Sequence, residues 1–330
     1  HLLRRLTAAL LAAVLALSIA LPVFASDDGD TIYINSVSDL LSLARNCAYD
    51  QWSVGKTVIL QKDLSLEGML WEPIPSFSGQ FKGNGHTISD LTITGQYSPA
   101  GLFGIVEEQG SIESLSVRGV VSVSDSADTT TGGIVGINHG TLINCQFTGV
   151  VTGDSEVGGI VGRNESEGTI DHGTARAIVT GKSSTGGIAG YNLGAITGCT
   201  NVGSINTEYP EASLDTDGFT AKMVDYINNK MAAADNDATN SVTNVATDTG
   251  GIAGRSSGMI LTSVNTGTIG YEHVGYNVGG IVGRTDGLVS GCVNQGRVLG
   301  RKDVGGIAGQ AEPYRELDLS KDRSEERRVG

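Results

Sequence analysis

Aromatic residues are scarce in this sequence: Phe, Trp and Tyr make up 5% of its 330 residues, whereas glycine alone contributes 48. So few aromatic side chains argue against a large globular core built on them. Lys and Arg are also few, 22 against 36 Asp and Glu, which gives a formal net charge of −14. Nucleic-acid binding needs clustered Lys and Arg to neutralise phosphates, so we expect no nucleic-acid partner.

Catalytic signatures are scarce as well. The zinc-peptidase motif His-Glu-x-x-His needs two histidines one helical turn apart, and none of the five histidines is followed by Glu. Glycan-cleaving enzymes use paired carboxylates, whereas the Asp27-Asp28 pair precedes the repeated region. His139 and His172 faintly resemble the Gly-His-Gly turn of pectin-cleaving β-helices, and we interpret both as exposed turn residues. The sequence therefore predicts no catalytic, cofactor-binding or metal-ligating residue, and no cofactor.

The sequence does contain a repeated glycine box, which first appears at residues 132–136 as Gly-Gly-Ile-Val-Gly. Five further copies begin at Gly158, Gly186, Gly250, Gly279 and Gly305. A looser copy begins at Ala100. Successive starts are mostly 26 to 29 residues apart, with longer steps of 32 and 64 residues. A period of this length is typical of a stacked architecture, in which one repeat cannot bury its apolar face alone.

Each repeat carries a strand pattern. Short apolar runs alternate with polar residues, glycine separates the runs, and helical spacing is missing. We expect about three short strands in each period. A propeller blade needs roughly 40 residues, so the shorter period favours a right-handed parallel β-helix with one repeat in each turn. The predicted fold class is all-β, a solenoid with an N-terminal capping helix and one helical insertion.

Equivalent positions of the repeats form columns. Glycine at the same point of every turn, as at Gly133 and Gly136, indicates either a corner with positive φ or a place too narrow for a Cβ atom. Another column ends in Asn201, Asn265 and Asn294, which we interpret as a ladder of side-chain amides rather than an active site. A third column predicts a continuous apolar ladder inside the coil, with strands ~4.8 Å apart. Its members are Leu102, Ile134, Ile160, Ile188, Ile252, Ile281 and Ile307.

Three of the four cysteines, Cys145, Cys199 and Cys292, share one further column. Gly173 lies between the first two in the alignment, and Ser263 lies between the last two. Cysteines two turns apart would lie about 9.6 Å from each other, beyond the ~7 Å limit for the Cα atoms of a disulfide. We therefore predict free, buried thiols, despite the oxidising compartment that secretion implies.

The two ends of the chain differ from the repeats. Residues 1–25 have the basic start, apolar run and small-residue cleavage site of a secretory signal peptide. We therefore expect a secreted or cell-surface protein, with no membrane span in the mature chain. Residues 314–330 form a tail without the repeat. Because 324–330 resembles a translated sequencing scar, we expect the chain to be a fragment that is truncated at this end.

Two regions lie between these ends. Residues 26–99 are predicted to form an N-terminal cap and the first irregular turns, and residues 100–313 are predicted to form the repeats. A helix with Ser36 as its N-cap would run to about Asn46 and cover the open first turn. Its expected apolar face consists of Val37, Leu40, Leu41 and Ala44.

One insertion, at 206–249, interrupts the repeats. It contains a helical pattern with an apolar stripe, which either lies against the coil or contacts a partner. Its acidic stretch, which begins at Asp235, lacks the Gly and Glu of a calcium-binding loop. We interpret that stretch as a solvated acidic loop.

The repeats, which read Gly-Gly-Ile-Val/Ala-Gly, resemble the GLUG motif. That motif is found in bacterial surface proteins and beside the catalytic domain of IgA-specific metallopeptidases. The region before the repeats resembles the usual lead-in of this family, with matching segments at 38–40, 58–64, 71–74 and 81–88. The likeness covers about residues 31–313 and implies a secreted or wall-associated β-helical region. It does not imply the peptidase, whose motif does not occur in this sequence.

These features favour a non-enzymatic β-helical spacer or adhesion module of a bacterial surface. The sequence does not identify its partner; a host or cell-wall glycan or protein fits. The alternative is an accessory β-helical region of a larger surface peptidase or glycan-active enzyme whose catalytic part is missing. A polysaccharide lyase or hydrolase on the coil itself is a third class. A His-Glu-x-x-His motif further along the full reading frame would favour the alternative.

Overall fold

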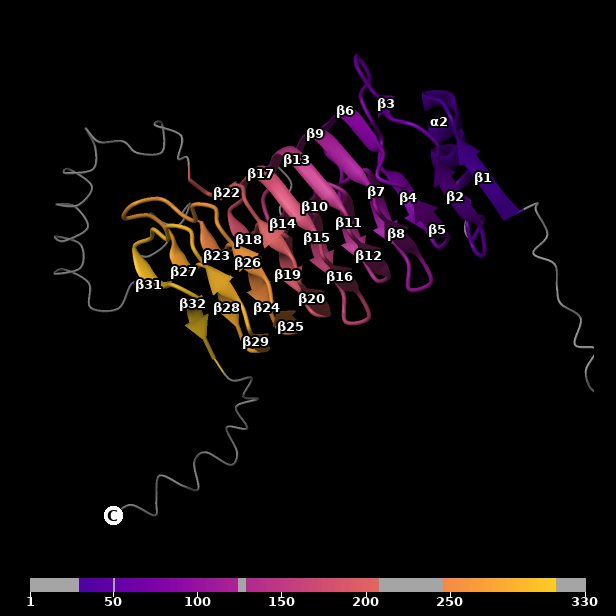
Figure 1. The fold of residues 1–330 in the computed structure, drawn as a ribbon. Coiled ribbons are helices and arrows are strands. Elements are labelled where there is room, and N and C mark those ends of the chain that lie inside the picture. The colour runs from indigo at the N-terminus through magenta and orange to yellow at the C-terminus, as the bar shows by residue number, and fades with distance from the viewer. Residues whose placement is uncertain (1–29, 50, 124–128, 208–245, 313–330) are drawn as a thin grey trace, which may run out of the picture.

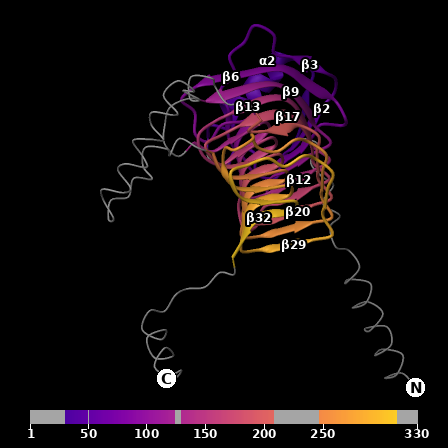
Figure 2. The same ribbon diagram turned by 90° about the vertical axis from the view of Figure 1, so that its left-hand side faces the viewer.

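The computed structural model describes residues 30–49, 51–123, 129–207 and 246–312. Over these residues the chain coils into a parallel β-solenoid, shown from the side in Figure 1 and after a 90° turn in Figure 2. The chain advances steadily along the solenoid axis, so each turn lies beside the turns that precede and follow it in the sequence. The predicted all-β solenoid is confirmed, and the coil is consistent with a right-handed β-helix.

Equivalent strands stack into four parallel sheets, A to D. Sheets A and B follow one another along the chain, and sheet B contains the longest strands. Sheet A consists of β1 (Thr31–Ile34), β2 (Thr57–Leu60), β5 (Gln80–Lys82), β8 (Ser111–Glu113), β12 (Thr141–Ile143), β16 (Thr169–Asp171), β20 (Ala195–Thr197), β25 (Met259–Leu261) and β29 (Leu288–Ser290). Sheet B consists of β3 (Leu64–Ser65), β6 (Thr87–Gly95), β9 (Ser116–Val123), β13 (Gln146–Thr152), β17 (Thr174–Thr180), β21 (Thr200–Asn201), β26 (Val264–Asn265) and β30 (Val293–Asn294), with β22 (Ser204–Ile205) also paired to β17.

The other two sheets contain the residues of the glycine boxes. Sheet C consists of β4 (Ile74–Phe77), β7 (Phe103–Val106), β11 (Val135–Asn138), β15 (Val161–Asn164), β19 (Ala189–Asn192), β24 (Ala253–Ser256), β28 (Val282–Thr285) and β32 (Ala308–Ala311). Sheet D consists of β10 (Thr131–Gly132), β14 (Val157–Gly158), β18 (Ser183–Gly186), β23 (Thr247–Gly250), β27 (Tyr276–Gly279) and β31 (Lys302–Gly305). From β10 onward a turn therefore has four strands, not three. The expectation was wrong because each glycine box joins two strands: its first glycine ends a sheet D strand and its fourth residue begins a sheet C strand.

The isoleucine column forms the predicted ladder inside the coil. Its members are fully buried from Leu102 to Ile281, and Ile307 in the last described turn is 42% exposed. Backbone hydrogen bonds join successive members, for example from Ile160 N to Ile188 O at 3.1 Å. The next bond, from Ile188 N to Ile252 O, is 2.9 Å long although 64 residues separate the two. The ladder therefore continues past the insertion without a gap.

The glycine columns are explained by lack of space and not by positive φ. Neither Gly133 nor Gly136 has a positive φ. A Cβ atom on Gly133 would lie 2.4 Å from Cγ of Phe147, and one on Gly187 would lie 2.5 Å from Cγ of Asn201. Glycine at the second position of the box therefore leaves room for the facing column of side chains, which contains Phe147 in an earlier turn and Asn201 in a later one.

Positive φ occurs instead at other points of the turns, one of which is the corner between sheets A and B. Its occupants are Ser114, Asn144, His172, Gly198, Thr262 and Gly291, with φ of 53°, 52°, 53°, 62°, 47° and 65°. The left-handed region is uncommon for residues other than glycine and most unfavourable for a β-branched residue. Thr262 is therefore the strained member of this corner.

The N-terminal end is covered by α2 (Val37–Asn46), the one helix among the described residues. Ser36 is its N-cap, because its Oγ accepts a hydrogen bond from Asp39 N at 3.2 Å. The Asp39 carboxylate accepts in turn from Asn35 N at 2.9 Å. The helix buries Leu40 and also Leu43, which the expected face omitted. The other expected members, Val37, Leu41 and Ala44, are partly buried against the core.

Strand β1 precedes this helix and pairs with β2, so the first strand of the coil lies earlier than expected. The two points at which the insertion leaves and rejoins the coil are adjacent, because Asn206 Nδ2 donates to Thr249 Oγ1 at 3.0 Å. The predicted signal peptide, the tail and most of the insertion, including its helix and acidic loop, lie outside the described residues. In the described ranges, no helix is both long and apolar enough to cross a membrane.

Truncation of Ile188 to Ala is expected to lower the free energy of unfolding by ~2–5 kcal/mol, because it empties a packed site in the middle of the ladder. Chemical denaturation followed by circular dichroism measures this loss. Ile307→Ala is the matched control: the same truncation at a half-exposed end of the ladder should cost clearly less. Equal losses for the two variants would contradict the ladder.

Replacement of Thr262 by Gly is expected to raise the free energy of unfolding by about 1 kcal/mol, because the gain from relieving left-handed strain exceeds the entropy that glycine loses on folding. Thermal denaturation measures the change. Thr197→Gly provides the control, since Thr197 ends β20 without positive φ and glycine should weaken that strand. A lower melting temperature for Thr262→Gly would contradict the explanation.

Candidate functional site

The two histidines singled out by the sequence lie at different corners of the coil. His139 follows β11 and is half-buried, not exposed as expected, and its backbone N donates to Val106 O of the preceding turn. His172 is exposed, and its Nδ1 lies 2.9 Å from the Asp171 carboxylate. No described hydroxyl or thiol is hydrogen-bonded to either imidazole. Nor do the described ranges hold a group of three or more potential metal ligands. The arrangement provides a His–Asp pair without a nucleophile.

One catalytic pattern escaped the sequence reasoning. Residues 254–258 read Gly-Arg-Ser-Ser-Gly, which fits the Gly-x-Ser-x-Gly spacing of a nucleophile elbow. An elbow must expose its serine between a strand and a helix. Here Ser256 ends β24 and is fully buried, and its Oγ accepts a hydrogen bond from Asn192 Nδ2 at 3.0 Å. The match is therefore a coincidence of the repeat, and Ser256 belongs to the core.

The asparagine column is the amide ladder that the sequence predicts. Asn201 Nδ2 donates to Asn265 Oδ1 at 2.8 Å, and Asn265 Nδ2 donates to Asn294 Oδ1 at the same distance. Asn201 and Asn265 are fully buried. Each amide is satisfied by its neighbour in the column, so the ladder has a structural role.

A second amide ladder was missed. It runs at the ends of the sheet C strands, where Asn138 donates to Asn164 and Asn164 donates to Asn192, both at 2.8 Å. Asn192 then donates to Ser256. The signal was present in the sequence, because asparagine occupies the sixth position after the start of three successive glycine boxes.

The cysteines are free, as predicted. Gly173 N donates to Cys199 Sγ at 3.2 Å, and Cys199 N donates to Ser263 Oγ at 3.1 Å, which confirms the predicted order of this column. Burial raises the pKa of both Cys145 and Cys199 to about 12. Cys292 is only half-buried, contrary to expectation, because sheets A and B end beside it among the described residues and no later strand of these sheets covers it.

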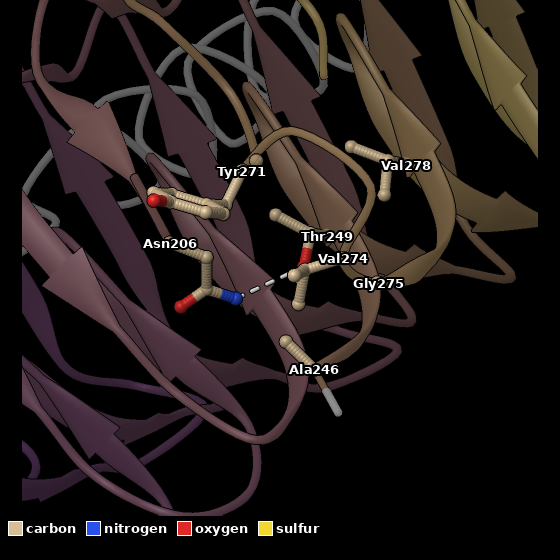
Figure 3. Close-up of a pocket in the computed structure, with 8 residues that line it drawn as sticks. Asn206, Ala246, Thr249, Tyr271, Val274, Gly275 and Val278 are labelled. Carbon is tan, nitrogen blue, oxygen red and sulfur yellow. Dashed lines mark hydrogen bonds between the residues drawn. The ribbon is translucent and has the colours of Figure 1, made fainter. Parts of the chain in front are cut away.

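A small hollow lies where the insertion joins the coil (Figure 3). Asn206 and Thr249 form one side, joined by their hydrogen bond, and Tyr271, Val274 and Val278 approach from the next turn. The hollow has a cavity volume of about 10 Å³, room for about one water molecule and far below the ~300–1,000 Å³ of typical ligand pockets. It is too small to be a substrate site, so the outer faces of the coil are the better candidates for binding.

The outer face of sheet C carries a partly exposed column with an unusual composition. Its last five members are Arg163, Tyr191, Arg255, Arg284 and Gln310. Two guanidinium groups lie on the Tyr191 ring, with their carbon atoms 5.2 Å from the ring centroid for Arg163 and 5.0 Å for Arg255. This spacing is within the range of cation–π attraction.

Two of these arginines are neutralised by carboxylates. Arg163 contacts Glu156 at 2.8 Å and Glu165 at 2.7 Å. Partial burial acts to lower the pKa of Arg163, but the two carboxylates outweigh it and raise the pKa. Arg284 lies 2.9 Å from Glu312.

Arg255 has no carboxylate partner among the described residues. Asp248 and Ser257 occupy the positions that Glu156 and Glu165 hold two turns earlier. The Asp248 carboxylate accepts instead from Asn277 Nδ2 at 2.7 Å. Ser257 Oγ lies 3.3 Å from the Tyr191 hydroxyl. The guanidinium of Arg255 is thus held by an aromatic ring while its N–H donors lack an anion.

No family model matches this chain, so the GLUG resemblance remains a prediction. Part of the chain is similar to Halomucin from Haloquadratum walsbyi, with 30% identity over 155 residues that make up 43% of this chain and 2% of that protein. Another similar protein, from Evansella cellulosilytica, is described as a Gly-rich membrane protein; the identity is 29% over 137 residues, 30% of this chain and 16% of that protein. The chain therefore spans a small part of both relatives.

A solved structure has a similar fold. It is described as an immunoglobulin A1 protease from Bacteroides ovatus, with a TM-score of 0.54 and 18% identity over 86% of this chain and 84% of that one. At this identity the likeness concerns the fold alone. It agrees with the fold that the family resemblance implied.

All four thiols are expected to be free in the unreduced protein, and Cys292, the least buried, should react first with a thiol reagent at pH 8. With a pKa of about 12, the two central thiols are almost wholly protonated at that pH. Mass spectrometry after timed alkylation measures both properties, and unfolding in denaturant gives the full count of four. Any linked pair in the native protein would contradict the order of the column.

Proposed function

We propose that this chain is a non-enzymatic, β-helical spacer and adhesion module that is secreted to a bacterial surface. The observation that carries the proposal is the unbroken ladder from Leu102 to Ile307, which passes the insertion without losing a hydrogen bond. In a solenoid each turn contacts only its neighbours. The result is an elongated support whose length depends on the number of turns and whose outer columns vary without disturbing the core.

The relatives support a place at the cell surface. Both curated relatives are larger than this chain, and one is described as a membrane protein. A module that occupies a small part of such a protein is suited to hold other parts at a distance from the cell. The net charge of −14 favours a solvated outer surface that resists non-specific association.

A second function is an accessory region of a larger surface peptidase or glycan-active enzyme. It is favoured by the description of the solved neighbour as a protease, although that likeness is one of fold. In this case the solenoid would position a catalytic domain encoded elsewhere in the same reading frame. The complete gene distinguishes the two functions: a His-Glu-x-x-His motif would support the accessory role, and a wall anchor without such a motif would support the spacer.

The purified chain is expected to cleave neither pectin nor an immunoglobulin hinge, because the His172–Asp171 pair has no partnered nucleophile and Ser256 is buried. Product analysis by mass spectrometry after long incubation measures cleavage, with a known pectinase and a known IgA protease as positive controls. Cleavage by the wild-type chain that is lost in His172→Ala would overturn the non-enzymatic proposal.

A further inference from the structure

The electrostatic surroundings of the sheet C column differ between Arg163 and Arg255. Around Arg163 the outer face is balanced, since two carboxylates satisfy one guanidinium. Two turns further on, Asp248 keeps a carboxylate at the first position but accepts from Asn277 instead of pairing with Arg255, and the neutral Ser257 occupies the second position. A positive charge is thus left on a chain whose overall charge is −14. An unbalanced, partly exposed guanidinium on an acidic protein favours an anionic ligand.

The geometry around Arg255 also limits which anion fits. Its guanidinium carbon lies 5.0 Å from the centroid of the Tyr191 ring, so cation–π attraction holds the group over the ring. A guanidinium held in this way binds a carboxylate through two parallel N–H donors. The hydroxyl groups of Tyr191 and Ser257, 3.3 Å apart, lie in the same part of the column and can donate to or accept from a hydroxylated ligand.

We propose that Arg255, Tyr191 and Ser257 bind a linear polysaccharide that carries carboxylate groups, a polyuronate. The inference rests on the proposed adhesive role and names its ligand class. Three observations favour a glycan over an acidic peptide. The column is straight and repeats at the strand spacing of ~4.8 Å, its members offer hydrogen-bonding groups, and none of the large hydrophobic residues that are exposed elsewhere lies in it. Protein partners usually need a desolvated apolar or aromatic anchor pocket.

The net negative charge of the chain opposes a polyanion at long range. At physiological ionic strength this repulsion is screened over about 8 Å, whereas the Arg255 contact acts at hydrogen-bond distance. Several uronate units that bind along one column raise the affinity through effective concentration. Binding should therefore increase with the length of the polymer.

The test uses the full chain and polygalacturonate as the probe, with binding measured by isothermal titration calorimetry at physiological ionic strength. Arg255→Gln should weaken binding about tenfold, the loss that corresponds to one charge-assisted hydrogen-bonded pair. Tyr191→Phe, which keeps the ring and removes the hydroxyl, should weaken binding less. Arg176→Gln is the matched control, because Arg176 is exposed on β17 of sheet B. This variant should bind like the wild type.

Fully methyl-esterified pectin, which lacks the carboxylate, should not bind, and poly-glutamate should bind more weakly than polygalacturonate. Thermal denaturation of each variant shows whether the fold is kept. Equal losses for Arg255→Gln and Arg176→Gln would overturn the site. Equal binding of poly-glutamate would overturn the glycan in favour of an acidic peptide. Absence of binding by the folded wild type would overturn this inference. The proposed function would not be affected by that result, because the cleavage assay tests it separately.

Discussion

Every other feature of this protein depends on parallel pairing of each turn with the next in a fixed register. Because equivalent residues lie directly above one another, a polar side chain that enters the interior must find its partner in its own column. Asn138, Asn164 and Asn192 meet this condition. Asn138, at the top of the ladder, meets it with its Nδ2 group only: it pairs in register with Val106 on the other side, and its Oδ1 is buried without a donor.

The same register lets the core change gradually along the axis. Near the N-terminus the interior is filled by three aromatic rings, with Phe103 lying 5.4 Å from Phe77 and 5.5 Å from Phe81 between ring centroids. Further along, the column that contains Phe147 changes to alanine and then to asparagine. Apolar burial, the main favourable term in folding, therefore decreases towards the C-terminal turns, and hydrogen-bonded amides take its place.

Separation of core and surface allows one outer column to serve different purposes in different turns. Arg163 and Arg255 occupy equivalent positions on sheet C. Both lie over the Tyr191 ring, but the first also forms two ion pairs within its own turn and the second forms none among the described residues. The backbone is the same in both turns, so the difference arises from the residues seven before and two after each arginine. Binding specificity in such a module can change through a few surface substitutions while the ladder remains intact.

The sequence by itself determined the solenoid, the isoleucine ladder, the first amide ladder and the free cysteines, because each depends on residues that recur at a fixed period. The tertiary structure decided what periodicity does not encode. It placed Asn138 and its column inside the coil, gave the left-handed corner to Thr262 rather than to the glycine boxes, and buried Ser256 despite its catalytic spacing. It also showed that Arg255 lacks the carboxylates of Arg163. Whether a side chain faces the core, a corner or a neighbouring charge depends on contacts between turns, and no single repeat contains that information.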